Sequence, residues 1–202
     1  MIIGLEGVSC TGKSTLASAL AARLGRTCVV PCYYHAAPDP SLLPAPLAAS
    51  EAEQHDALAQ HLQIEQLRAR HVRAAVGRGA HVVLDRTVDT LLAHLRAVGA
   101  IRTLDANASA RILVEQHIVQ GLAVVPEVTL LLQAGHEVLA ARAKGRPGMP
   151  PLYYDAVFAD GFHAHFRAPI TPICLSLDAA SPADQVLEHA CGLLKPYLEG
   201  LR

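Results

Sequence analysis

The sequence predicts an α/β fold, a five-stranded parallel sheet flanked by helices. Two observations predict it. Short apolar segments alternate along the chain with segments of helical periodicity, and strands separated by helices need crossover connections, which produce a parallel sheet covered on both faces. The chain has 202 residues, of which 51% are hydrophobic, enough to bury one sizeable core. We therefore expect one domain over residues 1–202.

Five apolar runs have the length and composition of buried strands. They cover residues 1–5, 27–30, 81–85, 127–132 and 172–177. In a parallel sheet of this kind, ligands bind beyond the carboxyl ends of the strands. The loops that follow the five runs are therefore expected to surround one site.

Helical periodicity separates these runs. Leucines at positions 16, 20 and 24 form one face of the first helix. Further helices are predicted over residues 51–76, 88–98, 107–120, 136–143, 153–167 and 183–199. Two segments break the pattern. Residues 38–46 read PDPSLLPAP, where repeated proline rules out a helix, and residues 144–151 are too rich in glycine and proline to be regular.

The first strand leads into GVSCTGKST, residues 7–15, which fits the spacing G-x-x-x-x-G-K-[ST] of a phosphate-binding loop. The glycines let the backbone curl so that its N–H groups point at phosphate oxygens, and the next helix aims its N-terminus at the same anion. In such a loop Lys13 bridges the β- and γ-phosphates of ATP, and the Ser14 hydroxyl ligates Mg²⁺. The predicted nucleotide-binding residues are Gly7, Ser9, Cys10, Thr11, Gly12, Lys13, Ser14 and Thr15.

Asp85 and Arg86 end the third predicted strand, at the same edge of the sheet. A carboxylate there is placed to hold Mg²⁺ through water, and a guanidinium to grip a phosphate or an anionic acceptor. An ordinary ion pair at the strand end is the alternative interpretation. The position beside a phosphate loop favours the functional one.

Arg142 and Arg146 flank the glycine- and proline-rich loop, with Lys144 between them. Phosphoryl transfer needs positive charge over the transferring group, because negative charge spreads across its equatorial oxygens. We therefore predict a short lid over about residues 142–152 that delivers these cations and excludes water. A solvated basic loop at a helix end is the alternative.

Arg68 lies on the apolar stripe of its predicted helix, four residues after Ile64 and four before Val72. A guanidinium that faces the core needs a partner. That partner is either a substrate or a neighbouring carboxylate, and the sequence leaves both open.

Composition excludes several classes of partner. The chain has 17 Lys and Arg residues and 18 Asp and Glu residues, so it lacks the net positive charge typical of proteins that bind nucleic acid or a membrane surface. No apolar run is long enough to cross a membrane, and no targeting signal is seen, so we expect a cytoplasmic location. The five cysteines form no CxxC pair and the 11 histidines no metal-ligand spacing. A small-molecule partner is therefore expected.

The residues resemble the thymidylate kinase family and its close relatives, the deoxynucleoside kinases. The resemblance runs through GLEGVSCTGKST (4–15), LRARHVRAAVGRGAHVVLDRT (67–87), GLAVVPEVTLLLQ (121–133) and ARAKGR (141–146). It implies a nucleoside-monophosphate-kinase-like P-loop fold, usually a homodimer, which transfers phosphate from ATP. It would make Arg68 the arginine that contacts the acceptor base. Catalysis would rely on Arg142 and Arg146, because the phosphate loop itself holds no arginine.

The acceptor side departs from the family pattern. Ser9 stands where a thymidylate kinase has an acidic residue, PCYYH (31–35) replaces an Arg-Glu-Pro-Gly segment, and Thr90 and His94 fall where a Ser and an aromatic-Gln pair are expected. The substrate-binding candidates are Arg68, Arg86, Thr90, His94, Tyr33 and His35. A hydroxyl acceptor would benefit from a general base, for which the loop offers His35 or Asp39.

The sequence therefore predicts an ATP- and Mg²⁺-dependent kinase acting on a nucleotide or a nucleoside-like small molecule. A kinase for a non-nucleotide metabolite or an antibiotic is one alternative, since the pocket residues differ. A nucleotide-dependent regulatory switch is another. Guanine-specific switches use an Asn-Lys-x-Asp loop, whereas the one asparagine here, Asn107, is followed by Ala108.

Overall fold

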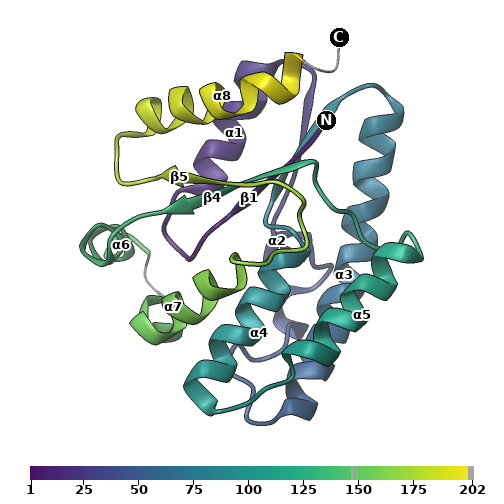
Figure 1. Cartoon of the computed structure of the whole chain (residues 1–202), viewed down its shortest axis with the longest axis vertical. Coiled ribbons are helices and arrows are strands. Elements are labelled where there is room, and N and C mark those ends of the chain that lie inside the picture. Colours follow the sequence, from purple (N-terminus) through teal and green to yellow (C-terminus); the bar gives the residue numbers. More distant parts are fainter. Residues whose placement is uncertain (147, 149, 200–202) are drawn as a thin grey trace.

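The computed structural model of the chain describes residues 1–146, 148 and 150–199. Five strands form one sheet in the order β2-β3-β1-β4-β5, and every neighbouring pair is parallel (Figure 1). The strands are β1 (Ile2–Glu6), β2 (Thr27–Val30), β3 (His81–Asp85), β4 (Val128–Gln133) and β5 (Cys174–Asp178). The predicted fold class is confirmed, and β1 with its phosphate loop lies at the centre of the sheet.

The helices fall close to their predicted ranges, except for the short helix over residues 33–36, where none was predicted. They are α1 (Lys13–Leu24), α2 (Tyr33–Ala36), α3 (Glu51–Gly77), α4 (Val88–Arg102), α5 (Asn107–Val119), α6 (His136–Ala143), α7 (Ala156–His165) and α8 (Ala183–Glu199). The helix expected over 153–167 is divided into a 3₁₀ turn, η2 (Pro151–Tyr154), and α7. Asp155 causes the division, because its carboxylate accepts a hydrogen bond from the Phe158 N–H at 3.1 Å and so caps α7.

The expectation that repeated proline keeps residues 38–46 free of helix was wrong for one turn, the 3₁₀ helix η1 (Pro40–Leu42). Proline is tolerated at the first helical position, where its missing N–H would have no partner in any case. Asp39 supplies the cap by accepting from the Ser41 N–H at 2.9 Å.

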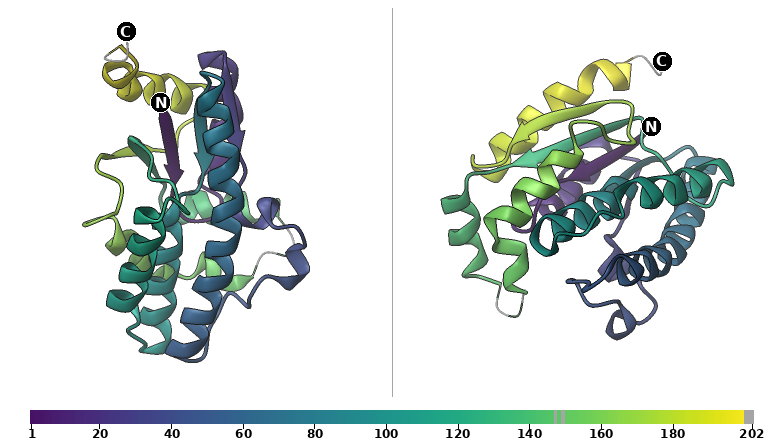
Figure 2. Two further views of the ribbon diagram at one scale, coloured as in Figure 1. Left: turned by 90° about the vertical axis from the view of Figure 1, so that its right-hand side faces the viewer. Right: turned by 60° about the horizontal axis from the view of Figure 1, so that its bottom comes forward.

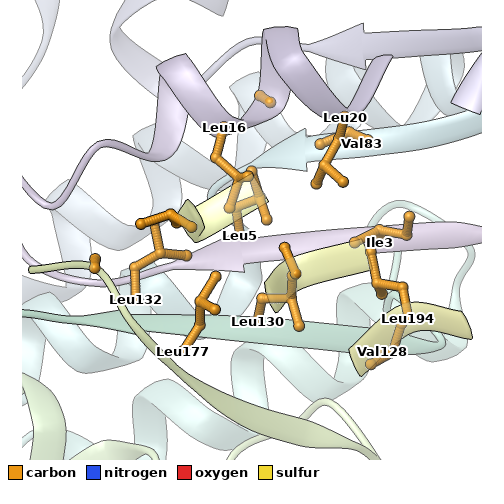
Figure 3. Packing of buried hydrophobic residues seen from close by; sticks show 14 residues of the cluster. Ile3, Leu5, Leu16, Leu20, Val83, Val128, Leu130, Leu132, Leu177 and Leu194 are labelled. Carbon is orange, nitrogen blue, oxygen red and sulfur yellow. The ribbon is translucent and has the colours of Figure 1, made fainter. Parts of the chain in front are cut away.

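Helices α1 and α8 cover one face of the sheet. Leu16 and Leu20 of α1 and Leu194 of α8 pack against the strand residues Ile3, Leu5, Val83, Val128, Leu130, Leu132 and Leu177 (Figure 3). Leucines four apart on α1 thus form the buried stripe that the periodicity predicted. Burial of this cluster fixes the angle at which α1 leaves the phosphate loop.

Helices α3, α4, α5 and α7 cover the other face. Val72 and Ala75 of α3 pack against Val30, Val82 and Leu84 of the sheet. Helices α3, α4 and α5 contact one another and lie side by side (Figure 2). Within the described residues, no helix has both the length and the apolar character needed to cross a bilayer.

A buried carboxylate joins α4 to α7. Asp89 is fully buried and accepts hydrogen bonds from the Ile170 N–H at 2.6 Å and the Thr171 N–H at 3.1 Å. The same carboxylate lies 2.7 Å from His165 Nε2 of α7. Because a buried carboxylate needs such partners, these contacts hold α7 and the segment before β5 in one position.

Candidate active site

The phosphate loop joins β1 to α1 through backbone conformations that favour glycine. Gly7 has φ 138° and Gly12 has φ 95°. A Cβ on Gly7 would lie 2.4 Å from the Leu132 carbonyl oxygen of β4, so no larger residue fits. Cys10 adopts φ 66° without being glycine. These turns bring the loop around the N-terminus of α1, as a phosphate site requires.

The Lys13 side chain folds back over this loop. Its Nζ donates to the carbonyl oxygens of Gly7 and Val8, both at 2.8 Å, and lies 3.3 Å from Thr11 Oγ1. Burial, reinforced by the charge of Arg86, lowers the pKa of Lys13 to about 7. Phosphate oxygens at this point would supply the negative charge that the ammonium needs.

Ser14 and Asp85 meet at the start of α1. The Ser14 hydroxyl donates to Asp85 Oδ2 at 2.6 Å, while Asp85 Oδ1 is buried and has no partner among the described residues. A buried carboxylate oxygen without a partner fits a cation or its water shell. No group of three or more His, Cys, Asp or Glu side chains that could hold a metal ion occurs in the described part of the chain. A Mg²⁺ ion would therefore rest on Ser14, Asp85, water and phosphate oxygens, which is how proteins commonly hold it.

Arg86, which follows Asp85 in the chain, contacts a threonine that in turn binds a buried acid not among the predicted site residues. Its Nη1 donates to Thr90 Oγ1 at 3.1 Å and to the Gly7 carbonyl oxygen at 3.4 Å. Thr90 in turn donates to the carboxylate of Glu6, the last residue of β1. Burial raises the pKa of Glu6, and the charge of Arg86 opposes that rise. In the sequence, the signal for this buried acid was the position of Glu6 at the end of an apolar strand.

Glu6 also holds the start of α4. Its Oε1 accepts from the Thr87 N–H at 2.7 Å and from the Thr87 hydroxyl at 2.9 Å. Arg86 itself adopts φ 71°, a left-handed conformation that is unusual for a residue with a side chain. The network around Glu6 thus fixes the direction of the Arg86 side chain.

The predicted lid residues lie over the phosphate loop. Arg142 Nη1 lies 3.5 Å from the Cys10 carbonyl oxygen, and Arg146 lines the cavity described below. Tyr154, just after the predicted lid, lies with its hydroxyl 3.9 Å from Cys10 Sγ. Within the range 142–152, residues 147 and 149 lie outside the described residues.

A cavity of about 700 Å³ extends from the phosphate loop into the space between α3, α4 and α7, closed on one side by residues 40–48. The sequence-predicted residues that line it are Ser9, Cys10, Gly12, Lys13, Ser14, Tyr33, His35, Asp85, Arg86, Thr90, His94 and Arg146. Those that do not line it are Gly7, Thr11, Thr15, Asp39, Arg68 and Arg142. One space therefore joins the phosphate loop to most of the acceptor candidates.

The far half of this cavity contains residues that sequence reasoning did not single out. They are Leu58, Leu91, Leu95, Gln54, His61, Tyr153, Phe158 and Phe162. Most of them belong to the apolar stripes of helices, and periodicity cannot tell a residue that faces a cavity from one that faces the core. Gln54 gave no signal, because a glutamine in the second turn of a helix is ordinary.

His94 faces this half of the cavity in a neutral form. Its Nε2 lies 2.8 Å from the Pro46 carbonyl oxygen, and its ring packs against Phe158 with ring centroids 5.4 Å apart. Burial lowers the pKa of His94 to about 4. At neutral pH it therefore contributes polarity without charge.

Arg68 has a carboxylate partner, the second of the two alternatives left open above. The side chain is 1% exposed, and its Nη1 lies 2.6 Å from Glu65 Oε2. Its other nitrogens donate to the carbonyl oxygens of Pro31, Asp85 and Arg86. The guanidinium thus ties the end of β2 to the end of β3 beneath the cavity floor.

Tyr33 and His35 lie on the single turn of α2, which follows β2. The Tyr33 hydroxyl donates to Glu65 Oε2 at 2.9 Å, and its ring packs under the Arg68 guanidinium, 4.3 Å from the ring centroid. His35 Nδ1 lies 3.1 Å from Cys32 Sγ. Tyr34 is largely exposed and packs edge-on against His35.

The sheet order and the loop geometry define an α/β P-loop fold, and comparison with known proteins specifies it further. No protein-family model matches the chain, and no curated protein does. The solved structure of deoxyadenosine kinase from M. mycoides with bound dATP is 14% identical, with a TM-score of 0.69, and the match covers 96% of this chain and 100% of that one. Thymidylate kinase from Candida albicans is 18% identical, with a TM-score of 0.69, over 97% of this chain and 91% of that one. The chain therefore has the P-loop fold shared by thymidylate and deoxynucleoside kinases.

Proposed function

We propose that the protein is an ATP- and Mg²⁺-dependent kinase that phosphorylates a nucleoside-like or nucleotide-like small molecule. The observation that carries this proposal is the continuous cavity of about 700 Å³, which joins the Lys13–Ser14–Asp85 site to an apolar chamber large enough for a second ligand. A phosphoryl group in transfer would lie where the phosphate site meets the apolar chamber, and would face the nucleotide on one side and the acceptor on the other.

The donor half has a role for each residue. The loop N–H groups and Lys13 would bind the β- and γ-phosphates, while Ser14 and Asp85 would hold the metal ion. Bound Mg²⁺ would supply a positive charge between the phosphates. Arg86, Arg142 and Arg146 would stabilise the negative charge on the transferring oxygens from the other side.

The acceptor half favours an uncharged acceptor that reacts through a hydroxyl. Among the described residues that line the cavity, the lysine and arginine residues are Lys13, Arg86 and Arg146. Lys13 and Arg86 bond to phosphate-loop carbonyls, and Arg146 belongs to the lid over that loop. An acceptor monophosphate would have to share these cations with ATP, whereas a neutral hydroxyl compound would not.

A hydroxyl acceptor needs a group to take its proton. Of the two candidates that the sequence offered, Asp39 caps η1 and does not line the cavity, whereas His35 does. We propose His35 as the base. Its Nδ1 lies 3.1 Å from Cys32 Sγ, and in the tautomer with the hydrogen on Nδ1 the lone pair of Nε2 would receive the proton.

The remaining expectations from the resemblance stay proposals. We propose that the whole chain acts as one kinase domain, as a homodimer in the cytoplasm, with residues 142–152 as its lid. Light scattering after size-exclusion chromatography tests the dimer, since a monomeric mass at micromolar concentration would contradict it.

The proposal is tested by incubation with ATP and Mg²⁺ against a panel of nucleosides, nucleoside monophosphates and aminoglycoside alcohols. ADP release and product mass are followed, and Lys13→Ala serves as the blank. Phosphorylation of a nucleoside supports the proposal in full, and phosphorylation of a monophosphate removes the role of His35. Modification of an aminoglycoside alone would favour the antibiotic alternative. ATP binding without any transfer would favour a regulatory switch.

A further inference from the structure

Cys32 and His35 form a pair of a nucleophile and a base at the rim of the cavity. Cys32 Sγ lies 3.1 Å from His35 Nδ1, and both residues line the cavity. Cys32 is half-buried and His35 is exposed, while the intervening Tyr34, which also lines the cavity, is 59% exposed. The pair is therefore accessible to solutes that enter this end of the cavity.

The imidazole is placed to take the proton of the thiol. In the tautomer of His35 with its hydrogen on Nε2, the lone pair of Nδ1 faces the Cys32 S–H. The thiolate, and not the thiol, is the nucleophilic form of cysteine, and a histidine within hydrogen-bond distance is the usual way to generate it. This tautomer differs from the one in which Nε2 would act as base for an acceptor hydroxyl, so the two roles of His35 exclude each other at any moment.

Two other cysteines hold their hydrogen against groups that are not bases. Cys28 Sγ donates to the Val29 carbonyl oxygen and Cys10 Sγ to the Tyr154 hydroxyl, both at 3.9 Å. Neither acceptor takes up a proton near neutral pH, so these contacts do not activate the sulfur. Cys10 is also only 8% exposed.

The remaining two cysteines are less reactive for a different reason. Burial raises the pKa of Cys174 to about 11 and also raises the pKa of Cys191. A thiol that keeps its proton is a poor nucleophile. Neither residue lines the cavity. All five cysteines are free, and the contacts single out Cys32 among them.

We infer that Cys32 is a modification site for low-molecular-weight disulfides, with His35 as its base. The Cys32 thiol gives its proton to His35 Nδ1, its sulfur bonds to one sulfur of the disulfide, and the S–S bond of that compound breaks. The leaving thiolate takes the proton back from His35, so the products are one mixed disulfide and one free thiol. A free thiol reverses the exchange and restores Cys32.

The modification would take up part of the cavity. Because Cys32 and His35 both line it, the attached group competes for space with a ligand at this end. The inference thus adds reversible control by the thiol–disulfide balance to the proposed function. The exchange itself does not depend on phosphoryl transfer.

Mass spectrometry of the intact protein incubated with oxidised glutathione tests the inference. The wild-type protein should gain the mass of one glutathione, peptide mapping should place it on Cys32, and dithiothreitol should remove it. Cys32 should react at least about tenfold faster than each other cysteine. The variant Cys32→Ser should take up glutathione no faster than those other cysteines do.

Histidine variants test the base. His35→Gln keeps a polar side chain that cannot take up a proton, so it should slow the reaction of Cys32 at neutral pH by about tenfold or more. The difference from wild type should shrink above about pH 9.5, where thiols ionise without help. The control is His71→Gln, at an exposed residue of α3 that does not line the cavity, and it should react at the wild-type rate. A thermal melt of each variant confirms that it is folded.

Four outcomes would overturn the inference. They are no adduct at millimolar oxidised glutathione, faster reaction at a cysteine other than Cys32, an unchanged rate in His35→Gln, and an internal disulfide, which lowers the mass by two hydrogens, in place of the adduct. ADP release by unmodified protein without any disulfide present tests the proposed function independently. Modification of Cys32 can therefore be observed where phosphoryl transfer fails, and the reverse is equally distinguishable.

Discussion

The Arg68 guanidinium and the Glu65 carboxylate form a fully buried ion pair, 2.6 Å apart and one turn apart on α3. The same guanidinium donates to the carbonyl oxygens of Asp85 and Arg86, the two residues that end β3 in the candidate site. Arg68 thus supports the backbone of the site from below. It is a positioning residue in this arrangement and does not line the cavity.

Replacing Arg68 with alanine should therefore lower stability more than acceptor affinity. The variant would leave Glu65 buried without its cation, which is expected to lower the free energy of unfolding by about 3 kcal/mol or more. Urea denaturation measures this change. The double variant Arg68→Met with Glu65→Gln is the control, and it should recover part of the loss because no unpaired charge remains. Wild-type stability together with a raised acceptor KM would instead make Arg68 the acceptor contact that the family resemblance implies.

The Ser14–Asp85 contact predicts that a substitution at Asp85 impairs Mg²⁺-dependent turnover more than ATP binding. Asp85→Asn keeps the shape of the side chain but removes the charge that would hold Mg²⁺, so kcat should fall at least about 100-fold while ATP affinity changes little. Titration of activity with Mg²⁺, beside ATP binding measured without metal, checks this. Equal loss of turnover and of metal-free ATP binding would count against a metal role for Asp85.

The lid arginines should act on the transition state. Substituting both Arg142 and Arg146 with alanine is expected to lower kcat by about 10³-fold with ATP affinity nearly unchanged, because the charge they would stabilise develops during transfer. The control is Lys144→Ala, at the exposed residue between them. A change confined to KM would show that the two arginines only help to bind the nucleotide.

The neutral state of His94 predicts acid sensitivity. Its pKa is about 4 in the folded protein against an ordinary value of 6.5. The unfolded chain therefore takes up a proton first as pH falls, and the stability associated with the neutral ring is lost between about pH 6.5 and pH 4. The loss amounts to about 3 kcal/mol at most. Denaturation at several pH values measures it, with His94→Phe expected to show a flatter profile. Identical slopes for the two proteins would refute the assignment.

The sequence by itself determined the order along the chain of the five strands and of every α-helix except α2, the phosphate loop and the Asp85–Arg86 pair. These features are local. Helical periodicity, the apolar runs of buried strands and the glycine spacing of a phosphate loop can each be recognised within about 10–20 residues. Their meeting at one edge of the sheet followed from the crossover rule for parallel strands.

The tertiary structure alone decided which residues meet across long separations. Glu6 reaches Thr87, which caps α4, and Thr90 within α4, while Gln54 of α3 reaches Leu95, 41 residues further along the chain. Arg68 fitted two partners equally well until the folding of α3 over β2 and β3 placed Glu65 and three carbonyl oxygens around it. A polar group in an apolar stripe shows in the sequence that a partner is needed, but only packing determines which one it finds.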